Sequence, residues 1–502
     1  MNDGDKASYG QIFKSTAIVG GSQVINILVG IVRAKFMAVL LGPAGVGLMG
    51  MYQAVTAIVG AVTGLGISSS GVRQIAEAAA SHDEIRIART ILTLRRTALC
   101  LGIVGVFAAI GFSKPLSRIT FGNEDHAWAV AVLGLTLLLG SISGGQVALV
   151  QGMRRIADLA TINVIGAALG TALSVPIIYI WGEAGIVPSL VVVSAMGILP
   201  AWWYARKITV PRVSLPFGEV AKEARSLVSL GLAFMASSLM STAVLYLIRV
   251  LVARELGMAS VGLYQAATTL SALYIGVVLN AMGMDFYPRL TAVSEDNATI
   301  NRLVNEQTEV GLLVATPGLM VTLAFAPFVI QLLYSGQFVP AYHVLRWQIL
   351  GVFLRVVAWP LGFVLLAKGK GRTFFLSELT WNCLHLTLVW ILVPLFGLEG
   401  TGIAFFGLYV CCTLGVLVVV NRITGFRWSS VNIRLGSSFA IIVTVAFLLA
   451  ILPQKNHGMV ANGCLTAAVA LWCLRRLYTL VGAAWFTEVG LKIKHRLGFL
   501  RS

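Results

Sequence analysis

A succession of long apolar segments covers almost the whole chain and limits the fold more than any other feature of the sequence. A helix needs about 20 mostly apolar residues to cross a bilayer, and in lipid only helices and closed barrels satisfy every backbone polar group. Because the segments lack the strict alternation of barrel strands, we expect an all-α polytopic membrane protein with about 14 transmembrane helices. The expected spans cover residues 10–40, 45–70, 91–112, 126–150, 160–181, 185–205, 226–253, 260–283, 308–334, 341–367, 374–396, 400–421, 435–453 and 459–482.

The charge content agrees with a membrane location. Only 11% of the residues are charged and 58% are hydrophobic, whereas a soluble domain has about 25% charged residues. The net charge of +17 does not indicate a nucleic-acid partner, because no RRM, helix-turn-helix or zinc-finger pattern occurs. The six cysteines lie in apolar segments without CxxC spacing, so we interpret them as packing residues.

Arginine and lysine are distributed unequally between the loops. Counted from the N-terminus, the even-numbered loops are basic, whereas the odd-numbered loops are short and nearly empty, with Lys114, Arg118 and Lys455 among their residues. Basic loops stay on the cytoplasmic side of a membrane protein. The sequence therefore predicts a multi-pass protein whose two termini are both cytoplasmic.

The chain contains an internal repeat. LGPAGVGL at residues 41–48 matches LGMASVGL at residues 256–263, an offset of 215 (256 − 41), and Arg33 and Arg249 are 216 apart (249 − 33). Further landmarks keep nearly this offset across about six helices, so both halves should have the same orientation, with a site where they meet. The expected parts are an N-terminal six-helix lobe (1–210), a C-terminal six-helix lobe (211–425), and two extra transmembrane helices with a basic cytoplasmic tail (426–502).

Two motifs within these halves resemble a known family. LGPAGVGLMGMYQA, which follows a charged first helix, and DFYPRLTAV at residues 285–293 resemble the Wzx-type flippases of lipid-linked oligosaccharides. That family belongs to the MOP exporter superfamily, which also contains the MATE drug exporters and the MurJ lipid II flippases. The resemblance covers roughly residues 10–421. It implies a V of two lobes in the bacterial inner membrane, open alternately to the cytoplasm and the periplasm.

The same resemblance implies the substrate and the partners. The substrate would be undecaprenyl pyrophosphate carrying a repeat unit of O-antigen, enterobacterial common antigen or exopolysaccharide. The expected partners are this lipid-linked oligosaccharide, the lipid bilayer, and a polysaccharide polymerase with its chain-length regulator, but no nucleic acid.

Basic residues inside or at the end of the expected spans form the candidate substrate site. A charged side chain at that depth is costly and usually faces protein or water rather than lipid. Arg33 and Arg249 occupy matching places in the two halves, which predicts a cationic site for an anionic substrate. Arginine offers a planar fork that matches phosphate oxygens. The candidate substrate-binding residues are Arg33, Lys35, Arg249, Arg254 and Arg355.

Some of these residues have a second interpretation. Lys35 and Arg254 could instead reach the headgroups of the outer leaflet, and Lys35 lacks a basic counterpart because Leu251 occupies the matching place. Arg346 and Arg355 are nine residues apart in the tenth span and thus lie on nearly opposite faces. The deeper Arg355 is the better candidate for the cavity.

Four further residues are candidates for gating or ion coupling. Asp285 and Arg289 are spaced i, i+4 at the inner end of the eighth span, where they predict an ion pair or a gate. Glu378 and His385 are seven apart, on one face of the eleventh span. Either could couple transport to H+ or Na+ entry, or serve as a satisfied packing group. Apart from such an ion, no cofactor and no metal are expected.

Transport is the preferred interpretation, and two alternatives stay open. The chain has no GxxxxGK[ST], GxSxG or HExxH motif, so we do not expect an enzyme. A MATE-like cation-coupled drug exporter would need carboxylates in its cavity, whereas arginine predominates in these spans. A non-transporting membrane scaffold for polysaccharide assembly would not require paired basic residues in the repeats.

Overall fold

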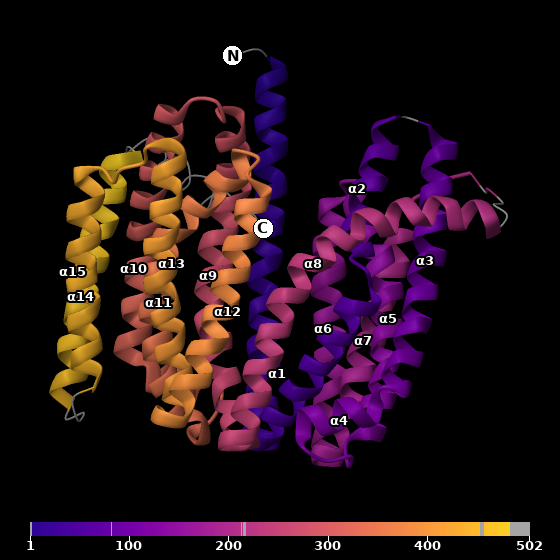
Figure 1. Ribbon diagram of the computed structural model, residues 1–502, viewed down its shortest axis with the longest axis horizontal. Coiled ribbons are helices and arrows are strands. Elements are labelled where there is room, and N and C mark those ends of the chain that lie inside the picture. Colours follow the sequence, from indigo (N-terminus) through magenta and orange to yellow (C-terminus); the bar gives the residue numbers. More distant parts are fainter. Residues whose placement is uncertain (1–2, 82, 212, 214–216, 452–455, 482–502) are drawn as a thin grey trace, which may run out of the picture. The chain divides into compact units, whose positions relative to one another are not determined.

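The computed structural model describes residues 3–81, 83–211, 213, 217–451 and 456–481, and within these residues all regular secondary structure is helical (Figure 1). The predicted all-α architecture is therefore confirmed. The α-helices are α1 (Asp3–Thr63), α2 (Ile67–Ala80), α3 (Glu84–Gly111), α4 (Ser113–Phe121), α5 (Ala127–Gly152), α6 (Ile156–Trp181), α7 (Ile186–Ala205), α8 (Phe217–Leu256), α9 (Met258–Ala292), α10 (Asn297–Leu333), α11 (Tyr342–Ala367), α12 (Gly371–Phe396), α13 (Glu399–Thr424), α14 (Ser430–Ile451) and α15 (Asn456–Val481). Two short 3-10 helices, η1 (Gly182–Gly185) and η2 (Gly336–Ala341), precede α7 and α11.

Many of these helices can cross a membrane. Within the described residues, nine helical segments are long and apolar enough, or ten if the bent halves of α8 form one span. These nine or ten segments of the described residues are fewer than the fourteen spans expected from hydropathy. Two of the nine segments are longer than a single pass requires, since Gly21–Thr63 has 43 residues and Ile156–Ala205 has 50.

The first two expected spans form one interrupted helix. Within α1, Gly42 has φ 64° and ψ −174°, and Pro43 follows it. Glycine adopts a positive φ without steric cost, and proline has no N–H to continue the helical ladder. The second expected span, 45–70, also ends earlier than expected, because α1 stops at Thr63 and Gly66, with φ 63°, precedes α2.

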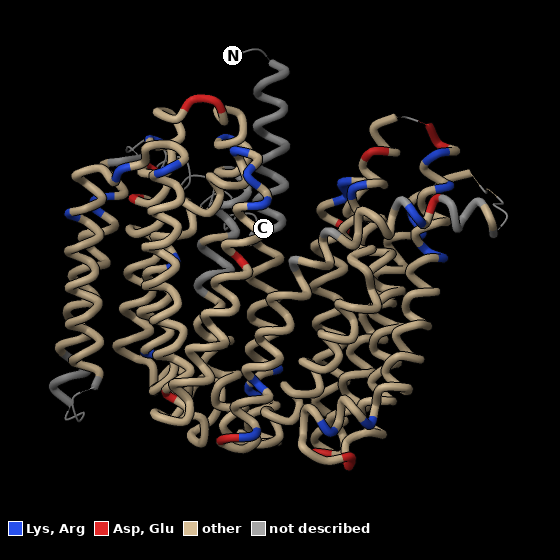
Figure 2. Tube along the Cα trace, in the orientation of Figure 1, with Lys and Arg blue, Asp and Glu red and all other residues tan. Residues whose placement is uncertain are grey.

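The chain forms two compact units. Unit 1 comprises Met1–Gln265 and Gln331–Phe338, and unit 2 comprises Ala266–Ile330 and Val339–Ser502. In both units, charged residues gather at the ends of helices and are sparse along their middles (Figure 2). This distribution is typical of helices whose central part lies in lipid. The lobe boundaries at 210 and 425 follow from the repeat alone and stay a prediction.

Unit 1 is built around α1, α3, α5, α6 and α7, which pack against one another. One of its cores joins Ile75 of α2, Leu94 of α3, Leu149 of α5 and Leu227 of α8, all of which are fully buried. In unit 2, α13 packs between α11 and α12, and α14 and α15 run side by side (Figure 1).

The two copies of the repeated motif pack against each other within unit 1. A Cβ on Gly47 would collide with the carbonyl oxygen of Met258, and a Cβ on Gly262 would collide with that of Pro43. Gly262 and Met258 lie 215 residues after Gly47 and Pro43 (262 − 47, 258 − 43). The contact is thus reciprocal, and each copy places a glycine against the backbone of the other.

Candidate functional site

The matched arginines lie on two helices of unit 1 that contact each other. Arg33 is on α1 and Arg249 on α8, and these helices pack together. Each arginine stands about two turns before a glycine of positive φ, Gly42 (64°) or Gly257 (80°). The repeat therefore extends from the sequence motif to the backbone geometry around each arginine.

Hydrogen bonding distinguishes the two guanidinium groups. Arg249 donates from Nη2 to Oε1 of Gln265 at 2.7 Å, while its buried Nε has no partner among the described residues. In Arg33 both Nε and Nη2 are buried without a hydrogen-bond partner in the described part of the chain. A buried donor without an acceptor is costly and rare in proteins. Arg33 therefore presents two desolvated donors that an anion can satisfy.

The repeat accounts for this difference. Gln265 stands 215 residues after Gly50 (265 − 50), so the half that contains Arg33 has glycine where the other half has glutamine. A Cβ on Gly50 would lie 3.6 Å from Gln265 Oε1, which places the two positions next to each other. We did not predict the contact of Gln265 with Arg249 from the sequence, although Gln265 lies two residues beyond the second copy of the motif.

Lys35 and Arg254 hold the carboxyl ends of helices. Lys35 donates from Nζ to the carbonyl oxygen of Gln331, near the end of α10, at 2.9 Å. Arg254 donates from Nη2 to the carbonyl oxygen of Ile119, in the last turn of α4, at 2.6 Å. Cations are favourable there because the final carbonyl groups of a helix have no partner within it. Their role toward substrate stays a prediction.

Arg355 belongs to unit 2, where three helices bring polar groups together. Its guanidinium carbon lies 5.6 Å from the ring centre of Tyr409 on α13. Glu378 of α12 is near enough to interact electrostatically with Arg355. Farther along α12, His385 meets the ring of Phe405 edge to face at 6.1 Å. The structure therefore gives Glu378 a cationic neighbour and His385 an aromatic one.

The proposed gate is described only in part. Arg289 is exposed in the last turn of α9. Asp285 lies in the same helix, but its side chain is outside the described residues. The ion pair expected between them therefore stays a prediction.

A partly buried ion pair in unit 2 was not expected from the sequence. Arg346 is 9% exposed in its side chain and contacts Glu399 with Nη2 and Oε1 2.6 Å apart. Trp347 donates from Nε1 to the same oxygen at 2.7 Å. This pair connects the start of α11 to the start of α13, and it explains why Arg346 belongs to the packing and not to the candidate site.

A second polar contact joins the repeated motif to a loop of unit 1. The hydroxyl of Tyr52 is hydrogen-bonded to Nδ1 of His126 at 2.8 Å. The ring of Phe121 packs against the imidazole ring, with 4.1 Å between the ring centres. Burial lowers the pKa of His126 below its ordinary value, and the charge of Asp125 opposes that shift. Among the described residues, no three His, Cys, Asp or Glu side chains are grouped as metal ligands.

Comparisons with known proteins agree with this architecture. The family model described as "Polysaccharide biosynthesis protein" matches residues 36–343. The chain is 24% identical over 421 residues to the lipid III flippase of Escherichia coli (strain K12), a match that covers 82% of this chain and 99% of the relative.

Two solved structures share the fold. A structure of the lipid II flippase MurJ in an inward closed conformation superimposes with a TM-score of 0.67 at 14% identity, covering 93% of this chain and 99% of MurJ. An inward-facing multidrug transporter of the MATE family, within the MOP superfamily, gives a TM-score of 0.64 at 17% identity and covers 79% of this chain and 95% of the transporter. At such identities the likeness shows the fold alone.

Proposed function

The chain belongs to the family of polysaccharide biosynthesis proteins, and from this premise we propose that it is a flippase for lipid-linked oligosaccharides. Its substrate is an undecaprenyl-pyrophosphate-linked repeat unit, which it moves across the bacterial inner membrane for O-antigen, enterobacterial common antigen or exopolysaccharide synthesis. The flippase among its relatives supports transport rather than catalysis.

The pair of matched arginines carries this proposal. Arg33 and Arg249 place three buried nitrogen atoms without described partners on two packed helices of one unit. A pyrophosphate that leaves water needs compensating charge and hydrogen-bond donors, and guanidinium groups supply both. Arg33, with two such donors, is the principal anion ligand, and Arg249 is the second ligand, oriented by Gln265.

Transport then proceeds by alternating access. The pyrophosphate and sugars cross past the arginines, while the polyprenyl chain stays in lipid. Such translocation is reversible, so its direction comes from an ion gradient, from the membrane potential or from consumption of the product by a polymerase. Glu378, beside Arg355, and His385 are the groups we assign to coupling with H+ or Na+, and Asp285 and Arg289 are the gate.

A cationic drug exporter is the main competing function, because the MATE fold is shared. A cation would need carboxylates, whereas the charged groups of unit 1 that have buried atoms without a described partner are Arg33 and Arg249. The arrangement therefore favours an anionic substrate.

Reconstitution of the wild-type protein tests this function. Proteoliposomes would carry either a fluorescent undecaprenyl-pyrophosphate oligosaccharide or a cationic dye, under imposed H+ and Na+ gradients. We expect the lipid-linked oligosaccharide to become protected from a membrane-impermeant quencher, and no efflux of dye. Dye efflux without protection would replace the flippase by an exporter, and inactivity toward both would favour a scaffold.

A further inference from the structure

A groove in unit 2 lies outside the region covered by the repeat. It is formed by α14 and α15 and encloses about 670 Å³. Its lining is mostly apolar, with Leu435, Phe439, Ile442, Val469 and Trp472 along its length. The rings of Phe439 and Trp472 meet edge to face at 5.8 Å. This lining is suited to a hydrocarbon chain.

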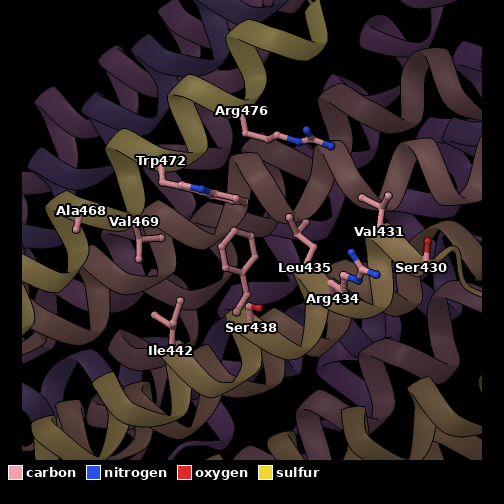
Figure 3. A pocket seen from close by; sticks show the side chains of 11 residues that line it. Ser430, Val431, Arg434, Leu435, Ser438, Ile442, Ala468, Val469, Trp472 and Arg476 are labelled. Carbon is pink, nitrogen blue, oxygen red and sulfur yellow. The ribbon is translucent and has the colours of Figure 1, made fainter.

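The polar part of the groove is confined to one end. Arg434 and Arg476 extend toward the end where Ser430 lies, while Ile442 and Ala468 lie at the other (Figure 3). This end is continuous with the basic loop before α14, which is predicted to face the cytoplasm. The groove is therefore amphipathic along its length, as a membrane lipid is.

Both arginine-bearing helices are fixed to α10 on adjacent turns. Asn305 accepts from the backbone N–H of Ser429, one residue before α14, at 2.8 Å. Glu309, one turn farther along α10, contacts Arg476 of α15 with Oε1 and Nη2 3.1 Å apart. The guanidinium of Arg476 is thus held directly by Glu309, and the start of α14, which carries Arg434, is held through the backbone of Ser429.

The charges at this end do not cancel. Arg476 is matched by Glu309, whereas the exposed side chain of Arg434 has no ion pair among the described residues. One positive charge is left over at the mouth of an apolar groove. A phosphodiester carries one negative charge, and a soluble phosphate would gain nothing from the apolar lining.

We propose that this groove binds one acidic phospholipid of the leaflet that faces the basic loops. Its phosphate lies between Arg434 and Arg476, and an acyl chain follows Phe439 and Trp472. The site is separate from Arg33 and Arg249, so it does not depend on the proposed transport function. The lipid would fill the space between the two helices that lie beyond the repeat.

Quenching of Trp472 fluorescence by brominated lipids tests this site. The full-length protein would be reconstituted in phosphatidylcholine vesicles that contain brominated phosphatidylglycerol or, at equal mole fraction, brominated phosphatidylcholine. The difference between each protein and its Trp472→Phe variant isolates the signal from this residue. We expect brominated phosphatidylglycerol to quench Trp472 more strongly, and the preference to fall about fivefold in Arg434→Gln, as expected for one arginine near an anionic lipid.

Arg372→Gln is the matched control, because Arg372 is an exposed arginine at the start of α12 in the same unit. It should keep the preference. Equal quenching by both lipids, or equal losses in the two arginine variants, would overturn the proposal. So would recovery of Trp472 fluorescence on adding stoichiometric undecaprenyl pyrophosphate, since the groove would then hold the tail of that lipid.

Discussion

Two arginines in equivalent places have different surroundings because one neighbouring residue differs between the repeats. Gln265 accepts from Arg249, whereas the matching position in the other repeat is Gly50. Arg33 has two buried donors without a described partner, and Arg249 has one. The proposed anion site is therefore asymmetric at the level of single atoms.

Replacing Gln265 should change the orientation of the Arg249 guanidinium while leaving its charge in place. In Gln265→Leu the guanidinium loses a charge-assisted hydrogen bond, worth about 1.5–3 kcal/mol, and samples more rotamers. We expect the half-saturating substrate concentration for flipping to rise, with the protein still folded. Gln53→Leu, the same substitution at a half-buried glutamine three residues after Gly50, should leave it unchanged. Equal effects of the two variants would show that Gln265 has no positioning role.

The Arg346–Glu399 pair should contribute to stability. Glu399→Gln removes the charge that faces a 9% exposed arginine, so we expect a loss of about 2–3 kcal/mol and a lower melting temperature in detergent. Arg346→Met combined with Glu399→Gln should recover part of that loss, because no unpaired buried charge then remains. A double variant less stable than Glu399→Gln would argue against this explanation.

His126 should make stability depend on pH. Because burial lowers its pKa, the folded protein favours the neutral ring, and the unfolded chain takes up a proton first as the pH falls. The contribution of His126 to the free energy of unfolding is complete above the pKa of an unfolded histidine, about 6.5. It declines as the pH drops below that value. Melting temperatures at about pH 7.5 and 5.5 check this decline, which should shrink in His126→Phe. A melting temperature that rises on acidification would contradict the assignment.

At the scale of helices, glycine contacts define where the two motif copies meet. Gly47 and Gly262 each leave room for a carbonyl oxygen of the other copy. These glycines occur within matching motifs, so the sequence predicted their equivalence but not their contact. The internal repeat shows which residues correspond, whereas the contact between them depends on how the helices cross.

Alanine at Gly262 should disturb this contact. Its methyl group would collide with the carbonyl of Pro43, so α1 and α9 must separate locally, and we expect reduced thermal stability and slower flipping. Gly30→Ala is the matched control within α1, because nothing lies within 4 Å of its Cβ position and alanine is the better helix former. If Gly262→Ala is no less stable than Gly30→Ala, the contact is not tight.

Hydropathy predicted the elements well and their ends less well. Every expected span from residue 10 to 421 overlaps a helix, because apolar length is the property that a bilayer selects. The shorter α2 and α4 were not expected, since their polar residues lower the local hydropathy. The interruption at Gly42 was expected as a loop between two helices and is instead a kink within one continuous run.

At the scale of the whole molecule, the repeat led to the candidate site but not to its details. The matching arginines were visible as a constant offset between charged residues in apolar segments. The partners of Lys35 and Arg254 were not, because their acceptors are backbone carbonyls more than 130 residues away in sequence. Backbone acceptors leave no trace in residue type, so only the folded chain reveals them.

We propose that Arg33 binds the pyrophosphate during flipping. The most direct measurement compares wild type, Arg33→Lys and Arg33→Ala in proteoliposomes that contain a fluorescent undecaprenyl-pyrophosphate oligosaccharide. Equal melting temperatures would establish that the variants are folded. We predict that Arg33→Ala slows flipping at least about tenfold, because charge-assisted hydrogen bonds are lost, and that Arg33→Lys retains intermediate activity. Flipping by Arg33→Ala at the wild-type rate would contradict the claim.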